Sequence, residues 1–142
     1  SGTVLLTGQV FVPAGITLTI DAGTTIYAYR ATYAPSGPDL AGAPAVVVEQ
    51  DATIMAQGTA SAPITFTSAL SDSNLPASGL WGGLIILGNA PVRGGTDTIE
   101  GLTEGGAYGG SESDDSSGVL SYVRVWYGGS VIGDDNEING IT

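Results

Sequence analysis

The chain of 142 residues suits a single domain, and a hydrophobic content of 42%, with 23 glycines scattered among β-forming residues, excludes both disorder and collagen. Fourteen acidic residues oppose three arginines, without lysine or histidine, and the net charge of −11 excludes the basic patch that nucleic acids and anionic membranes require. The absence of cysteine excludes disulfides and thiolate metal sites, and no run of 18 apolar residues exists that would span a membrane.

Short apolar runs predict strands along the whole chain. Residues 17–20, 64–67 and 121–126 alternate between apolar and polar side chains, which gives a strand one buried and one wet face. Residues 45–48 and 84–87 are apolar on both faces, so we expect a loop or a partner to cover these strands from outside. No segment has the apolar spacing of a helix, and the fold class is therefore all-β.

Three segments rich in turn-forming residues predict loops between these strands. Residues 30–44 are rich in proline, residues 69–78 are polar, and residues 101–118 are rich in glycine, serine and acidic residues. We expect each of them to be inserted at a corner between strands.

Internal repeats predict a solenoid. Residues 21–28 are echoed by residues 51–56, and residues 16–19 by residues 64–67, at offsets that fit turns of about 24 residues. An aromatic residue followed by two glycines occurs three times, at Trp81, Tyr108 and Tyr127. We therefore predict a right-handed parallel β-helix of about five to six coils with inserted loops, forming a single domain over residues 1–142.

Neither end of the sequence shows a cap. No amphipathic helix precedes the first strand, and residues 137–142 read as a strand rather than a polar cap. Two interpretations stay open: the chain is the N-terminal part of a longer solenoid, or other chains cover its ends. Because it begins at Ser1 without a basic and apolar leader, we interpret it as a processed segment.

Four segments carry a resemblance to a known group of proteins. Residues 10–26, 79–92, 118–129 and 136–142 resemble segments of the large secreted β-helix proteins of marine Gram-negative bacteria, and the Leu-Trp-Gly-Gly and Asn-Glu-Ile-Asn-Gly motifs are the most specific. The resemblance implies a right-handed β-helix, a secreted or cell-surface location and further coils in most members. Some similar proteins form surface layers or extracellular coats.

Acidic residues concentrate in the second half of the chain. Nine of the fourteen lie between Asp97 and Glu137, in loops rich in glycine and serine that can supply the oxygen ligands of Ca²⁺. The alternative is a solvated acidic loop, because neither cluster has the EF-hand or the nonapeptide spacing. The predicted metal ligands are Glu112, Asp114, Asp115, Asp134, Asp135 and Glu137.

The sequence predicts no catalytic residue. Without histidine or cysteine, the common triads and cysteine nucleophiles cannot form. The pairs Asp114/Asp115 and Asp134/Asp135 are nominal carboxylates for glycoside hydrolysis, but adjacent strand residues point to opposite faces. Arg124 is the nominee for the proton acceptor of a calcium-dependent lyase; its alternative role is charge balance on a wet face.

Aromatic residues offer a second type of surface. In residues 121–126, alternation places Tyr122 and Trp126 on one face with Arg124 between them, an arrangement able to hold a sugar or a neighbouring chain. The alternative is that the aromatic side chains fill the core or pack beneath loops. The candidates are Tyr27, Tyr29, Tyr33, Tyr122, Trp126 and Tyr127.

Two functional hypotheses follow. The first is an extracellular structural protein of a surface layer, filament or adhesive stalk, which self-associates end to end or through loops and is stabilised by cations. Because the chain contains no lysine, it cannot form lysine isopeptide crosslinks, and such an assembly is non-covalent. The second is a module that binds or degrades an extracellular polysaccharide. Neither involves nucleic acid or membrane insertion.

Overall fold

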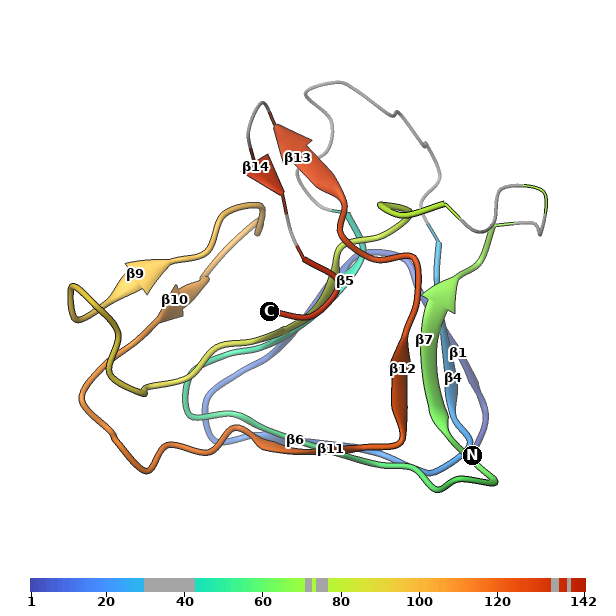
Figure 1. Ribbon diagram of the computed structural model, residues 1–142, viewed down its shortest axis with the longest axis horizontal. Helices are drawn as coiled ribbons and strands as arrows, with labels where there is room; N and C mark the ends of the chain where they lie inside the picture. The colour runs from blue at the N-terminus through green and yellow to red at the C-terminus, as the bar shows by residue number, and fades with distance from the viewer. Residues whose placement is uncertain (30–42, 71–72, 74–76, 134–135, 138) are drawn as a thin grey trace.

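The computed structural model describes residues 1–29, 43–70, 73, 77–133, 136–137 and 139–142. Seen along the solenoid axis, the chain winds around a triangle (Figure 1). Each side of the triangle is one parallel sheet, named A, B and C in the order in which the chain first visits them. The fold is consistent with a right-handed parallel β-helix, as the sequence predicts.

The strands of each sheet stack in register. Sheet A contains β1 (Thr3–Leu6), β4 (Thr25–Ala28), β7 (Ile64–Ser68) and β12 (Val123–Val125). Sheet B contains β2 (Gln9–Val12), β5 (Ala45–Val48) and β8 (Gly83–Ile86). Sheet C contains β3 (Thr17–Ile20), β6 (Thr53–Gln57) and β11 (Gly118–Ser121).

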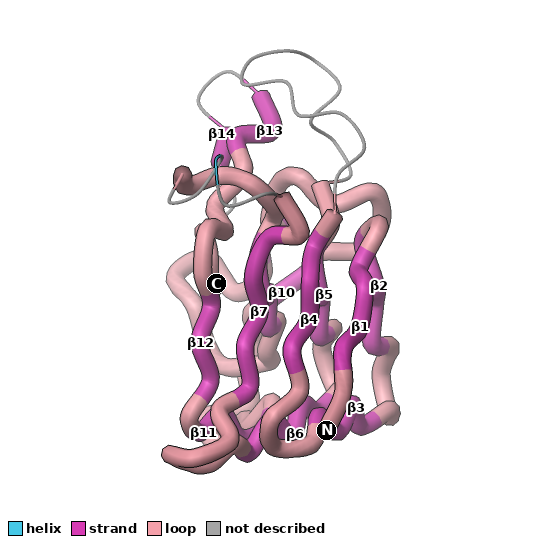
Figure 2. Tube along the Cα trace, turned by 90° about the vertical axis from the view of Figure 1, so that its right-hand side faces the viewer, coloured by secondary structure: helices cyan, strands magenta, loops and turns pink. Residues whose placement is uncertain are grey.

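Two antiparallel hairpins project from the solenoid (Figures 1 and 2). One pairs β9 (Asp97–Thr98) with β10 (Ala107–Tyr108), and the other pairs β13 (Val131–Gly133) with β14 (Asn136–Glu137). Both lie to the side of the stacked coils rather than across their ends, so they leave the ends of the solenoid accessible.

The predicted number of five to six coils is wrong. In the described part of the chain, sheet A has four strands and sheets B and C have three each, so three coils are complete and a fourth begins. The first coil is short, because Thr3 pairs with Thr25, 22 residues later. Later coils contain insertions: Ile64 pairs with Val123, 59 residues later. The inserted loops therefore contain residues that the prediction assigned to additional coils.

The similar sequence segments that predicted the repeat do not form strands that stack on one another. Residues 16–19 fall mainly in β3 of sheet C, whereas residues 64–67 fall in β7 of sheet A. Likewise, residues 21–28 lead into sheet A and residues 51–56 into sheet C. Each side of the triangle requires the same alternation and the same turn chemistry, so segments on different sides resemble one another.

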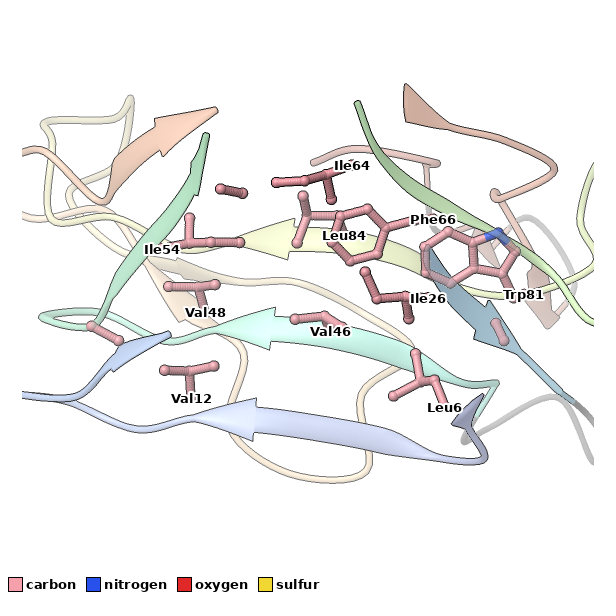
Figure 3. Packing of buried hydrophobic residues seen from close by; sticks show 13 residues of the cluster. Leu6, Val12, Ile26, Val46, Val48, Ile54, Ile64, Phe66, Trp81 and Leu84 are labelled. Atoms are coloured by element: carbon pink, nitrogen blue, oxygen red, sulfur yellow. The ribbon is translucent and has the colours of Figure 1, made fainter. Parts of the chain in front are cut away.

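The core fills the triangle with the inward side chains of all three sheets (Figure 3). Trp81 is fully buried, and its ring stacks on Phe66 with 6.3 Å between centroids and 7° between planes. Trp81 Nε1 donates a hydrogen bond of 2.7 Å to the backbone oxygen of Trp126, which joins the third coil to the fourth. The specific Leu-Trp-Gly-Gly motif is thus part of the architecture, with its polar atom satisfied.

The two glycines of that motif allow the coils to approach closely. A Cβ atom on Gly82 would lie 3.0 Å from the Ala45 Cβ, and one on Gly83 would lie 2.5 Å from the Asn139 oxygen. Gly83 also has a φ of 147°, which disfavours other residues. Both positions therefore require glycine for the second, third and fourth coils to stack.

In sheet B, β5 and β8 are buried on both faces apart from the half-buried Ile86, which confirms the prediction for residues 45–48 and 84–87. On its outer face, Ala45, Val47, Ile85 and Leu87 form a second apolar cluster. The insertion of residues 88–117 covers this cluster with Ile99, Leu102 and Tyr108. A loop of the same chain, rather than a partner, supplies the cover.

Candidate functional site: the two ends of the solenoid

The N-terminal face of the solenoid consists of β1, β2 and β3. In the described structure, each of these strands pairs with a neighbour on one side only, namely β4, β5 and β6. Their other edges present free backbone donors and acceptors, as in any edge strand. The N-terminal face is therefore able to accept a further layer of strands.

Inward side chains of the N-terminal face form an apolar hollow of about 380 Å³. Val4 and Val10 point toward the axis, because they pair in register with the buried Ile26 and Val46, yet each is 49% exposed. Ile26 and Val46, one coil deeper, are each only 6% exposed, because the first coil lies over them. The apolar residues that line the hollow include Val4, Val10, Leu18, Ile20, Ile26 and Val46.

Residues 1–20, which contain β1, β2 and β3, include no charged side chain. The first coil continues to Thr24 and includes Asp21, which also lines the hollow and lies 3.7 Å from the Ser1 ammonium group. Exposed edge strands usually carry lysine, other charges, proline or bulges that prevent pairing with other chains. The strands β1, β2 and β3 themselves carry no charged side chain, so their edges lack this form of protection.

The C-terminal face has the same character. It consists of β12, β11 and a short segment in which Ile141 bridges to Leu84 of sheet B. Inward side chains are again exposed, with Leu120 at 37% and Ile141 at 53%. Between residues 116 and 133, Arg124 is the only charged residue, so the C-terminal face carries no acidic side chain from this segment.

The predicted calcium ligands are only partly within the described structure. Glu112, Asp114 and Asp115 are exposed, and an Asp115 carboxylate oxygen accepts a hydrogen bond of 2.9 Å from the Asn89 backbone N–H. Among the described residues, no group of three or more acidic side chains lies together to hold a metal ion.

Asp134 and Asp135 lie outside the described residues, and the side chain of Glu137 is not described either. Calcium binding therefore stays a prediction.

A polar corner that the sequence did not reveal anchors the insertion. Gln50 Nε2 lies 3.1 Å from the Gly88 oxygen, 2.9 Å from the Gly109 oxygen and 2.7 Å from Asn89 Oδ1. Asn89 Nδ2 in turn donates to Asp51 Oδ1 at 2.8 Å. Gln50 and Asp51 lie 38 or more positions from Gly88, Asn89 and Gly109, so no local pattern predicts that they meet.

The outer face of sheet A carries exposed aromatic residues. Trp126 is 46% exposed, and the Arg124 guanidinium lies 5.6 Å from its ring centroid, in cation–π geometry. Tyr122 is also exposed, but with a φ of 48° it lies at the corner between β11 and β12 rather than on the strand that carries Arg124. Tyr27 and Tyr29 are exposed near the other end of sheet A, and Tyr33 lies outside the described residues.

Comparison with known proteins identifies the family. No helix within the described residues is long and apolar enough to cross a membrane. No curated protein and no solved structure matches the chain. A family model described as a pectate-lyase-like β-helix domain matches residues 1–142, over all three sheets and both hairpins. The chain therefore belongs to the family of pectate-lyase-like β-helix domains.

Proposed function

We propose that this β-helix domain is an extracellular structural module that self-assembles through the ends of its solenoid, in a surface layer, filament or stalk. The observation that carries the proposal is the N-terminal face, with a largely apolar hollow of about 380 Å³ and no charged residue in β1, β2 or β3. Edge strands of this kind are templates for pairing with further strands.

Cations are expected to support the assembly. The net charge of −11 repels copies from one another, and divalent cations reduce this repulsion. Of the acidic residues predicted to bind Ca²⁺, Glu112, Asp114 and Asp115 lie in the insertion of residues 88–117, away from the stacked strands of the ends. Calcium would thus act on lateral loops while the ends provide the stacking contacts.

Electron microscopy of the purified chain in millimolar Ca²⁺ and in EDTA tests this function. Ordered filaments or sheets in Ca²⁺ that dissolve in EDTA are the expected result. Isolated particles about one domain in size under both conditions, at all protein concentrations, would contradict a structural role. Boiling in denaturant is expected to dissociate every assembly, because no lysine is present to form isopeptide crosslinks.

Polysaccharide binding is the second candidate, and the outer face of sheet A favours it. Exposed aromatic rings with an adjacent guanidinium suit the apolar face and the carboxylate of an acidic sugar, and the family description refers to pectate lyase. A screen of acidic and neutral glycans for binding and for unsaturated products tests this candidate. The Trp126→Ala variant is expected to lose binding at least about tenfold, since stacked aromatic residues dominate such contacts.

A further inference from the structure

The outer faces of the three sheets differ in their side chains. The insertion of residues 88–117 covers sheet B, and the described strands of sheet C contain no aromatic residue. Sheet A, which Figure 2 shows with β1, β4, β7 and β12 side by side, carries exposed rings on its outer face. These side chains point away from the solenoid axis, so they form a lateral surface that is separate from the two ends.

Two outward rings lie two strands apart in sheet A. Tyr27 of β4 pairs in register with Thr67 of β7. Trp126 lies opposite Thr67 just after β12, because the preceding residues of the two strands are paired, and its N–H donates a hydrogen bond of 2.9 Å to the Phe66 oxygen. Since neighbouring strands lie about 4.8 Å apart, the two ring positions are roughly 10 Å apart across the sheet. Tyr27 is 38% and Trp126 46% exposed, whereas Thr67 between them is only 8% exposed, so the two rings provide the free surface of this row.

A row of hydrogen-bonding groups runs beside the rings. Thr25, Thr65 and Arg124 pair in register on the same face, two residues before the ring row in each strand. The Arg124 guanidinium lies 5.6 Å from the centroid of the Trp126 ring, so the two rows meet there. A row of apolar rings beside a row of hydroxyl and guanidinium donors matches a sugar, which has an apolar face and polar edges.

Although the Arg124 guanidinium suits a carboxylate, the charge of the whole chain favours a neutral sugar. In the four strands of sheet A as the structure describes them, Arg124 is the only charged residue, whereas the chain has a net charge of −11. A polyanionic glycan would gain one favourable contact and would be repelled by the rest of the molecule. A neutral glycan meets the rings and hydroxyl groups of this face without that repulsion.

We infer that the outer face of sheet A binds a neutral, β-1,4-linked glycan that lies across the strands. In such a chain each sugar is turned over relative to the one before it, so every second sugar presents the same face, at a repeat close to two strand spacings. Tyr27 and Trp126 therefore contact sugars two units apart, and the second row donates hydrogen bonds to their hydroxyl groups. This inference rests on the second candidate for the proposed function and specifies its ligand and its site.

Isothermal titration calorimetry with defined oligosaccharides tests the inference. Cellohexaose is expected to bind the wild type, and cellobiose is expected to bind at least about tenfold more weakly, because it reaches only one ring. Maltohexaose, which is neutral but α-1,4-linked and curved, is the linkage control and is expected not to bind. Raising NaCl from about 0.01 M to about 1 M is expected to leave the affinity for cellohexaose unchanged, because a neutral ligand has no charge to screen.

Variants locate the site. Trp126→Ala and Tyr27→Ala are each expected to lower the affinity for cellohexaose at least about tenfold, whereas Trp126→Phe retains a ring and most of the affinity. The matched control is Val119→Ala, which removes an exposed apolar side chain from the outer face of sheet C and is expected to bind like the wild type. Circular dichroism and thermal melting check folding, and the comparison of oligosaccharides on the wild type remains decisive if a variant does not fold.

Three results would overturn the inference in distinguishable ways. Binding of a galacturonate hexamer instead of cellohexaose, lost in Trp126→Ala and weakened by salt, would retain a glycan site on sheet A but reject a neutral ligand. Equal affinities for cellobiose and cellohexaose, or for maltohexaose and cellohexaose, would reject a glycan that lies across both rings. Absence of binding to every oligosaccharide would reject the second candidate function as well and leave self-assembly untouched.

Discussion

Sheets B and C are built from strands of similar length but differ in what lies outside them. In β5 of sheet B all four residues are buried, whereas in β3 of sheet C exposed threonines alternate with half-buried apolar residues. The insertion of residues 88–117 covers sheet B, and no described segment covers sheet C in the same way. In these two sheets, the outward side chains are therefore apolar where a loop folds back over the sheet and mainly polar where no loop covers it.

The largest expected effect is a charge placed beneath the cover. Val47, in β5, points outward but is fully buried, so Val47→Asp would bury a carboxylate without a partner and cost about 4 kcal/mol of unfolding free energy. Gln57→Asp, on the exposed outer face of sheet C, is expected to change stability by less than about 0.5 kcal/mol. Urea denaturation measures both, and equal losses would show that the cover does not exclude water.

A cavity beneath the cover is the next largest effect. Ile85 is fully buried in the outer cluster, and Ile85→Ala is expected to cost about 3 kcal/mol because its neighbours cannot fill the space. Val119→Ala removes a side chain that is 41% exposed on sheet C, and its expected cost is about 0.5 kcal/mol. Thermal melting of the two variants checks this order. A larger loss of stability in Val119→Ala than in Ile85→Ala would contradict the conclusion that the insertion covers sheet B and leaves the outer face of sheet C exposed.

The polar corner sharpens the comparison further. Gln50→Ala removes the donor shared by the oxygens of Gly88, Gly109 and Asn89, at an expected cost of about 1–2 kcal/mol. Hydrogen exchange is expected to rise in residues 88–117 and to stay unchanged in β3 and β6. Uniform acceleration over all sheets would mean that the insertion does not open as a separate unit.

The smallest expected effect concerns the second attachment of the insertion. Gln9 Oε1 accepts a hydrogen bond of 2.8 Å from the Thr103 N–H, and its Nε2 donates one of 2.9 Å to the Gly101 oxygen. Because this site is partly exposed, water replaces much of what Gln9→Ala removes, and the expected cost is about 0.5–1 kcal/mol. Hydrogen exchange that becomes faster only at the amides near Thr103 would agree. A loss of unfolding free energy larger than that of Gln50→Ala would contradict the expectation that Gln50 holds the insertion more strongly than Gln9 does.

Local chemistry made most of the fold predictable. Alternation over residues 17–20 and the doubly apolar residues 45–48 correctly predicted which strands have one or two buried faces. The alternating run of residues 121–126 is not one strand, because it divides at the Tyr122 corner between β11 and β12. Coil length was not predictable, because a loop at a corner adds residues without changing the strands that stack. The echo between residues 16–19 and 64–67 shows the same limit, since different sides of the triangle require the same pattern.

The candidate site was predictable only in part. The uncharged character of the first three strands was predictable, because residues 1–20 contain no charged side chain. The hollow at the N-terminal face was not predictable, because it depends on which residues of the first coil turn inward. The corner formed by Gln50, Asn89 and Asp51 joins segments that only the folded chain brings together.

The most direct test of self-assembly through the largely apolar solenoid ends is the salt dependence of wild-type sedimentation velocity. Raising NaCl from about 0.01 M to about 1 M shortens the Debye length from about 30 Å to about 3 Å and screens the repulsion between copies. Contact through largely apolar faces predicts that larger species increase steadily with salt in EDTA. Species that shrink with added salt, or a monomer at every salt concentration, would contradict this account.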